Sequence, residues 1–89
     1  GGKLLRVKME LDGGDRPVIR TISLTGDFFL HPESVLPRIE EALCGLGWPE
    51  DEAVYAGTVQ KILDSHQATF IGVAPQDIAQ AIRMAVAAS

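Results

Sequence analysis

The sequence has little of what a small enzyme needs for an active site. Its 89 residues include one cysteine and two histidines. A single cysteine cannot form an internal disulfide, and His31 and His66 stand alone, so we expect neither a disulfide nor a metal site. Glycine-rich phosphate loops and local Ser/His/acid signatures are also missing. We therefore expect no complete catalytic site in this chain.

Positive charge and long apolar runs are scarce as well. Eight Lys and Arg residues stand against twelve Asp and Glu, for a net charge of −4, and no Lys/Arg run exceeds two residues. Nucleic-acid binding needs a cationic face, so we expect no nucleic-acid partner. No apolar stretch approaches the roughly 20 residues of a membrane span. The lone thiol suits a reducing compartment, and we expect a cytoplasmic protein with no membrane partner.

What is present begins with a β-hairpin. Residues 3–11 alternate apolar and charged side chains, as a strand with one buried face does. Residues 12–15, Asp-Gly-Gly-Asp, form a turn, and residues 17–25 read as the returning strand. Ile22 and Leu24 mark the apolar face of this second strand.

Three helices and one short strand follow. Each helix begins near a proline, at Pro32, Pro49 and Pro75, and residues 67–73 form the third strand. Pro37 either kinks the first helix or marks where its regular part begins. The predicted apolar faces of the three helices consist of Val35, Leu36, Ile39, Ala42, Leu43 and Leu46; of Val54, Tyr55, Val59, Ile62 and Leu63; and of Ile78, Ala81, Ile82, Ala85 and Val86. Residues 1–89 thus form a single α+β domain, a small antiparallel sheet with helices in the order β-β-α-α-β-α.

Three isolated side chains invite a functional reading. Cys44 is the strongest of them, because a thiol can carry sulfur or attack a carbonyl when its pKa is lowered. It lies near a helix C-terminus, where the dipole disfavours a thiolate, so we interpret it as a small buried residue. Trp48 is interpreted as a packing residue, with an interface anchor as the alternative. His31 is interpreted as a surface or helix-start residue, with a partner contact as the alternative.

Two short motifs resist a purely structural reading. Gly1-Gly2-Lys3 precedes the first strand, where paired glycines permit close backbone approach and the lysine adds a cation. Its alternative is a flexible start to the strand. Gly26-Asp27-Phe28-Phe29 ends the second strand, where neighbouring side chains point in opposite directions. One phenylalanine can then enter the core while the other meets a partner; the alternative is that both are buried.

Taken together, these motifs resemble the C-terminal accessory domain, or small subunit, of lipoate–protein ligases. The resemblance rests on Gly1-Gly2-Lys3-Leu4, the glycine-rich turn, Gly26-Asp27-Phe28-Phe29, Pro32-Glu33 and Leu43-Cys44-Gly45, and continues through Phe70-Ile71-Gly72-Val73 and Pro75-Gln76-Asp77-Ile78. Cys44, Pro37 and Ala74 depart from the family pattern, Ala74 because a capping Ser or Thr is expected before Pro75.

The resemblance implies a SufE/NifU-like fold, similar to the sulfur-transfer and iron–sulfur scaffold proteins. It also implies an ATP-dependent ligase in which lipoate and ATP form lipoyl-adenylate and the lipoyl group passes to an acceptor lysine. This chain would bind no cofactor by itself and would not be catalytic alone. Its partner would be a catalytic large domain or subunit, with a lipoyl domain or the glycine-cleavage H protein as acceptor. Gly1, Gly2 and Lys3 would face the adenylate or the partner, and the Gly26–Phe29 motif would form the interface.

Two rival functions remain open at this point. One is a sulfur-acceptor or iron–sulfur scaffold protein of the related fold that uses Cys44. The other is a structural interaction domain with no enzyme partner. The sequence does not decide whether the chain is a natural subunit or an excised domain, or whether octanoate replaces lipoate.

Overall fold

The computed structural model describes residues 5–85, and the predicted Gly1-Gly2-Lys3 motif lies outside this range. Strands β1 (Leu5–Asp12) and β2 (Val18–Gly26) form the expected antiparallel hairpin. A β-bulge interrupts the register, because Glu10 lies opposite Thr21 while Leu11 lies opposite Ile19. The bulge reverses the side-chain alternation of β2. Ile19 and Ile22 therefore both face the core although they are three residues apart.

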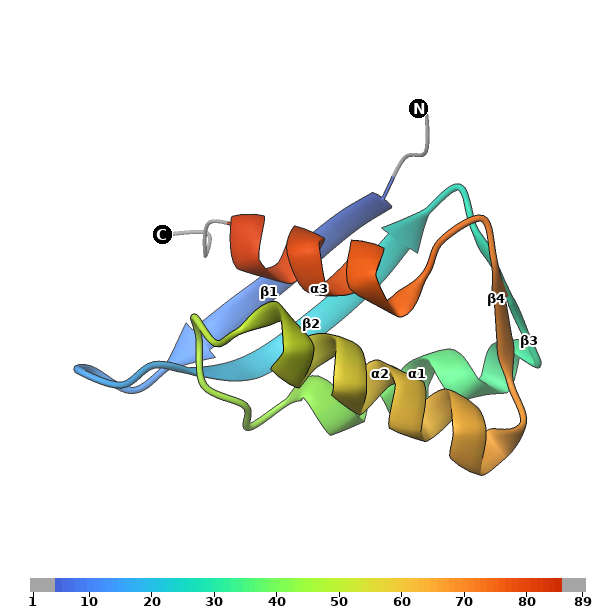
Figure 1. Ribbon diagram of the computed structural model, residues 1–89. Coiled ribbons are helices and arrows are strands. Elements are labelled where there is room, and N and C mark those ends of the chain that lie inside the picture. The colour runs from blue at the N-terminus through green and yellow to red at the C-terminus, as the bar shows by residue number, and fades with distance from the viewer. Residues whose placement is uncertain (1–4, 86–89) are drawn as a thin grey trace.

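The predicted single sheet is wrong in one respect, because residues 5–85 form two separate two-stranded sheets. Strand β3 (Phe29–His31), which the sequence analysis did not predict, pairs antiparallel with β4 (Thr69–Ile71). The chain leaves β2 at Gly26, whose φ of +145° is open to glycine and unfavourable for other residues. After this turn the chain runs away from the hairpin, so β3 pairs with β4 and not with β1 or β2 (Figure 1).

The helices begin and end close to the predicted positions. A 3₁₀ turn, η1 (Glu33–Val35), leads into α1 (Leu36–Leu43), so Pro37 lies in the first turn and does not kink the helix. Helix α2 (Glu52–His66) follows Pro49, and α3 (Pro75–Met84) begins at Pro75. Ala74 cannot cap α3 with its own side chain. Instead the Asp77 carboxylate accepts a hydrogen bond from the Ala74 N–H at 2.9 Å. This is the second of the two hydrogen bonds that make up a capping box, and it gives the Ala74 N–H a partner.

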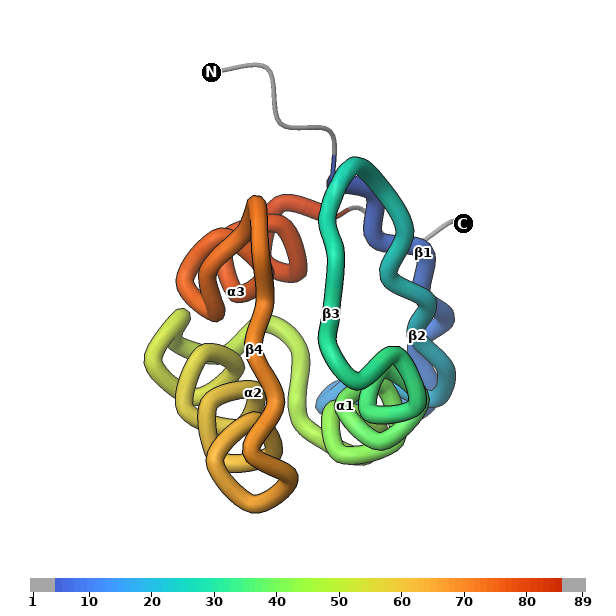
Figure 2. Tube along the Cα trace, turned by 90° about the vertical axis from the view of Figure 1, so that its right-hand side faces the viewer, coloured from blue at the N-terminus to red at the C-terminus, as the bar shows by residue number. Residues whose placement is uncertain are grey.

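One hydrophobic core joins the hairpin to the helices. Helix α3 packs on β1, α1 packs on β2, and α2 packs against both helices. Figure 2 shows the hairpin on one side of this core, α2 and α3 on the other, and β3 and β4 running side by side across one end. Most of the predicted helical stripes are buried or partly buried, but Val54 is 38% exposed, and Val86 lies outside the described residues. The buried side chains are Met9, Ile19, Ile22, Leu24, Leu30, Val35, Ile39, Leu43, Tyr55, Val59, Leu63, Val73, Ile78, Ala79 and Ile82.

Two aromatic side chains fix the loop between α1 and α2. The Tyr55 hydroxyl donates to the Gly47 carbonyl at 2.6 Å and accepts from the Glu50 N–H at 3.0 Å. Trp48 donates its indole N–H to the Ile82 carbonyl at 2.9 Å and packs against the core. The prediction that Trp48 serves in packing is therefore confirmed. None of the helices in residues 5–85 is long and apolar enough to cross a lipid bilayer.

Candidate partner-binding surface

The two phenylalanines of the Gly26–Phe29 motif point in different directions. Phe28 is half-buried and meets Phe70 edge-on, with ring centroids 5.5 Å apart and an interplanar angle of 68°. Phe29 is 73% exposed. The alternative in which both rings are buried is therefore wrong. One ring stabilises the fold, and the adjacent ring is free to contact another molecule.

A second glycine, Gly72, lies against the Gly26–Phe29 motif. Gly72, directly after β4, has a φ of +99°. A Cβ atom added there would lie 3.3 Å from the Asp27 carbonyl oxygen and 3.5 Å from the Phe28 Cα. The exit of β4 therefore passes so close to the motif that a side chain at position 72 would strain both the backbone and the contact.

Phe29 has an exposed apolar neighbour that the sequence analysis missed. Ile71 lies directly opposite Phe29 in the β3–β4 pair and is 58% exposed. Directly opposed side chains lie within contact distance of each other. We call these two residues the Phe29–Ile71 patch. Strand alternation in the sequence already puts Ile71 on the face opposite to Phe70. Its place beside Phe29 could not be predicted, because the pairing strand β3 was not predicted.

A shallow depression adjoins the patch on the α1 side. Its volume is about 510 Å³, and its lining is mostly apolar, with Glu33 as the one ionisable side chain among the described residues. Such a surface suits an apolar side chain of a protein partner better than a charged substrate. The lining residues are Leu24, Thr25, Gly26, Phe28, Phe29, Leu30, Glu33, Leu36 and Pro37.

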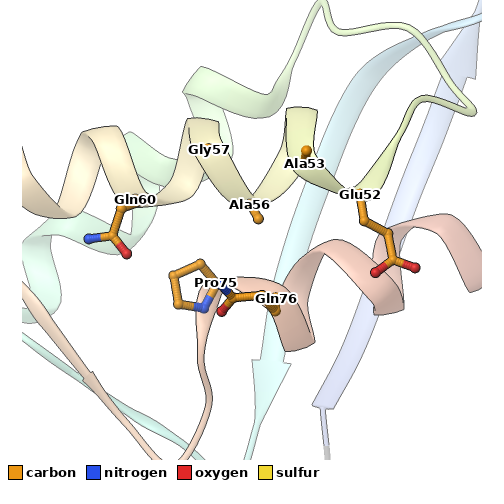
Figure 3. A pocket seen from close by; sticks show the side chains of 7 residues that line it. All are labelled: Glu52, Ala53, Ala56, Gly57, Gln60, Pro75 and Gln76. Carbon is orange, nitrogen blue, oxygen red and sulfur yellow. The ribbon is translucent and has the colours of Figure 1, made fainter.

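A second depression lies between the start of α3 and α2 and carries no reactive chemistry. Figure 3 shows it lined by short side chains and two glutamines, with Glu52 at one end. Its volume is about 380 Å³. Across residues 5–85, no group of three or more His, Cys, Asp and Glu side chains could hold a metal ion. The lining contains no nucleophile and no base other than that single carboxylate.

Cys44 does not occupy the position that we expected. It is exposed, so the interpretation of a buried thiol is wrong. Helix α1 ends at Leu43, and Cys44 already has an extended backbone with φ −66° and ψ 138°. Because the chain has left the helix, Cys44 no longer follows the buried stripe that Ile39 and Leu43 form. His31 is exposed in β3, in agreement with a surface histidine.

The first described residue of β1 lies at the same end of the hairpin as the Gly26–Phe29 motif, because Leu5 is opposite Gly26. Gly1, Gly2 and Lys3 lie outside the described residues, so their predicted role stays a prediction. Gly26, Asp27, Phe28 and Phe29 are the predicted site residues that the structure places together. Cys44 lies elsewhere: it directly precedes Gly45, whose N–H bonds to the Ile19 carbonyl near the other end of β2.

Known proteins resemble this chain in both sequence and structure. No family model matches the sequence. The chain is 32% identical over 87 residues to the lipoate-protein ligase A subunit 2 of Thermoplasma acidophilum, covering 91% of this chain and 78% of that protein. A solved structure superposes with a TM-score of 0.68 and 30% identity, over 94% of this chain and 86% of that one. That structure is described as an archaeal lipoylation system, a bipartite lipoate protein ligase and its E2 lipoyl domain from the same organism.

The predicted small-subunit resemblance and the predicted α+β fold are thereby confirmed, while the finer likeness to SufE/NifU-like proteins stays a prediction. With this identity spread over nearly the whole length, the chain belongs to the lipoate-protein ligase A subunit 2 family.

Proposed function

We propose that this chain is the accessory subunit of a two-part lipoate–protein ligase and that it docks on the catalytic chain through the Phe29–Ile71 patch. The observation that supports this most is the exposed apolar pair beside a mostly apolar depression. Large apolar side chains at the centre of a contact supply most of the binding energy in protein interfaces. The related chain from Thermoplasma acidophilum belongs to a bipartite ligase, which favours the same arrangement here.

In this proposal the chemistry belongs to the catalytic chain, which binds lipoate and ATP. A lipoate carboxylate oxygen bonds to the α-phosphorus of ATP, and pyrophosphate leaves. The amine of an acceptor lysine, on a lipoyl domain or the glycine-cleavage H protein, then attacks the acyl carbon, and AMP leaves. The accessory subunit contributes by closing over the bound adenylate and excluding water, which would hydrolyse it. We place this activity in the cytoplasm, since the lone thiol suits a reducing compartment.

Lys3 is the residue that we assign to the adenylate or to the partner at its edge. Lys3 lies outside the residues that the structure describes, and the resemblance of Gly1-Gly2-Lys3 to the family motif supports this assignment. A lysine can lower the cost of placing phosphate charge at the subunit boundary.

The test measures pyrophosphate release from lipoate and ATP by the cognate catalytic chain, with and without this protein, together with complex formation. We expect activity only when both chains are present. Phe29→Ala with Ile71→Ala should weaken the complex, whereas Val54→Ala, which removes exposed apolar surface at the start of α2, should not. Lys3→Ala should lower adenylation more than binding. Equal activity of the catalytic chain alone, with no complex, would overturn the proposal.

A sulfur-acceptor role for Cys44 is the second candidate, and the exposure of the thiol favours it. A persulfide on Cys44 after incubation with a cysteine desulfurase would support this role. The ligase proposal predicts instead that Cys44→Ser leaves pyrophosphate release unchanged.

A further inference from the structure

Among residues 5–85, the hairpin has one edge that α1 covers, on β2, and one edge that no other strand pairs with, on β1. On the β2 side, the Leu24 N–H donates to the Glu40 carboxylate at 2.8 Å. Nearer the turn, the Ile19 N–H donates to the Leu46 carbonyl at 2.8 Å, and the Ile19 carbonyl accepts from the Gly45 N–H at 2.7 Å. Helix α1 and the loop after it therefore bond three outward backbone groups of β2 and cover its outer edge, as natural proteins commonly do with exposed strands.

These same contacts identify which backbone groups β1 turns outward. In an antiparallel pair, residues alternate between positions that bond to the opposite strand and positions that point away from it. The backbone N–H and C=O groups of Leu24 and Ile19 point away from β1, so the backbone groups of their partners, Val7 and Leu11, point away from β2. By the same alternation, the backbone groups of Leu5 and Met9 also point away from β2. Among residues 5–85, no backbone or side-chain hydrogen bond reaches the outward groups of these four residues.

Burial is also incomplete on this side of the sheet. The inward side chains of β2, Ile19, Ile22 and Leu24, are all buried. On β1 only Met9 is buried, and Leu5, Val7 and Leu11 are half-buried. Met84 of α3, which is 73% exposed, borders Leu5 across a small depression. The apolar surface thus runs out to the open edge. A third strand beside β1 would cover this half-buried apolar surface.

The order of charges along β1 indicates that the third strand is β1 of a second copy of this chain. Along its exposed face, β1 carries two cations followed by two anions: Arg6, Lys8, Glu10 and Asp12. A second copy of β1 placed antiparallel, with Met9 opposite Met9, puts Lys8 opposite Glu10 of the second copy and Arg6 opposite Asp12 of the second copy. In this register Val7 meets Leu11 of the second copy, so the outward backbone groups of one strand face those of the other.

The neighbouring registers are electrostatically worse. A shift of one strand by two residues keeps the outward groups facing each other but places Lys8 against Lys8, or Glu10 against Glu10. Like charges directly opposite each other destabilise a strand pair. One register therefore combines about six new backbone hydrogen bonds with four opposite-charge pairs.

We propose that two copies of this chain pair through β1 around an axis at Met9 and form a continuous four-stranded antiparallel sheet. The pairing is isologous, as in most homodimers. It leaves the Phe29–Ile71 patch of each copy uncovered, because that patch lies on the separate β3–β4 sheet. The proposal does not depend on the ligase role, since it concerns this protein alone.

Sedimentation equilibrium of the full-length protein without its catalytic chain tests the pairing. We expect a reversible monomer–dimer equilibrium between low-micromolar and near-millimolar concentration, weakened by salt because the charge pairs are exposed. Amide exchange should slow with concentration at Val7, Met9 and Leu11 but not at Lys8, whose N–H already bonds to β2. A protein that stays monomeric at every concentration overturns the proposal, and so does a dimer in which these amides gain no protection.

Charge reversal provides the matched test. Lys8→Glu alone and Glu10→Lys alone each create two like-charge pairs, so each should raise the dissociation constant by about tenfold or more. Lys8→Glu is the cleaner of the two, because Glu10→Lys also removes the intrachain ion pair with Arg20. A mixture of the two variants restores four opposite-charge pairs and should form heterodimers. Arg38→Glu makes the same charge change on α1 and should not affect pairing. Val7→Pro removes an outward N–H together with a half-buried side chain, and it should abolish the dimer while circular dichroism stays unchanged. Dimers that survive both Val7→Pro and charge reversal would show that the interface lies elsewhere.

Discussion

Phe28 and Phe29 are adjacent in the sequence, yet truncation of each should affect a different property. Phe28 is half-buried and stacks edge-on against Phe70. A fully buried Phe→Ala change costs about 3–5 kcal/mol, so at half burial, with the lost aromatic pair, we expect about 2 kcal/mol from Phe28→Ala. For a domain of this size, that lowers the midpoint of thermal unfolding by roughly 8–16 °C.

Phe29→Ala should leave the fold intact. The ring is 73% exposed, so its truncation should change the free energy of unfolding by no more than about 0.5 kcal/mol. If Phe29 anchors the contact with the catalytic chain, its loss should cost about 2 kcal/mol of binding energy, a rise of roughly 30-fold in the dissociation constant.

The assay combines thermal unfolding of each variant with titration calorimetry against the cognate catalytic chain. Phe70→Ala serves as a matched control, because it removes the other half of the aromatic pair and should resemble Phe28→Ala in stability. The reasoning is refuted if Phe29→Ala unfolds as early as Phe28→Ala, or if it binds the catalytic chain as tightly as the unmodified protein does.

Two further predictions concern Gly72, beside the Gly26–Phe29 motif, and Tyr55, which holds the loop between α1 and α2. Gly72→Ala should destabilise the protein by about 1–3 kcal/mol in chemical denaturation, because φ is +99° and the new Cβ approaches the Asp27 carbonyl; a neutral effect would contradict the close contact. Burial raises the pKa of Tyr55 above its ordinary value near 10. The unfolded state then loses this proton at lower pH than the folded state, so stability should fall as pH rises above about 10, in the window up to the raised pKa. Tyr55→Phe should remove this pH dependence in denaturant titrations while costing about 1–3 kcal/mol at neutral pH, because it leaves the Gly47 carbonyl and Glu50 N–H without their partner.

Local sequence patterns determined most of the secondary structure. Alternation located the hairpin, and helical spacing with a proline near each start located α1, α2 and α3. The same patterns identified the Gly26–Phe29 motif and predicted that one of its two rings could face outward. These features depend on residues within a few positions of each other, where side-chain direction follows directly from backbone period.

Tertiary structure decided what depends on residues far apart in the chain. Strand β3 is three residues long and carries no periodic signal of its own; it exists because β4, some forty residues later, lies beside it. Ile71 became part of a candidate interface only through that pairing. The exposure of Cys44 likewise followed from where α1 ends against the β2 edge.

The open edge of β1 shows the same division. The sequence by itself specified the order of charges along the strand, two cations and then two anions. Which of its two edges is open was decided by the fold, because Glu40 and the loop after α1 close the edge of β2. Charge order is a property of neighbouring residues, whereas the occupancy of a strand edge depends on whatever distant segment packs beside it. For that reason the sequence of a strand determines which strands its charges can pair with, and the fold determines which edge of the strand is free for pairing.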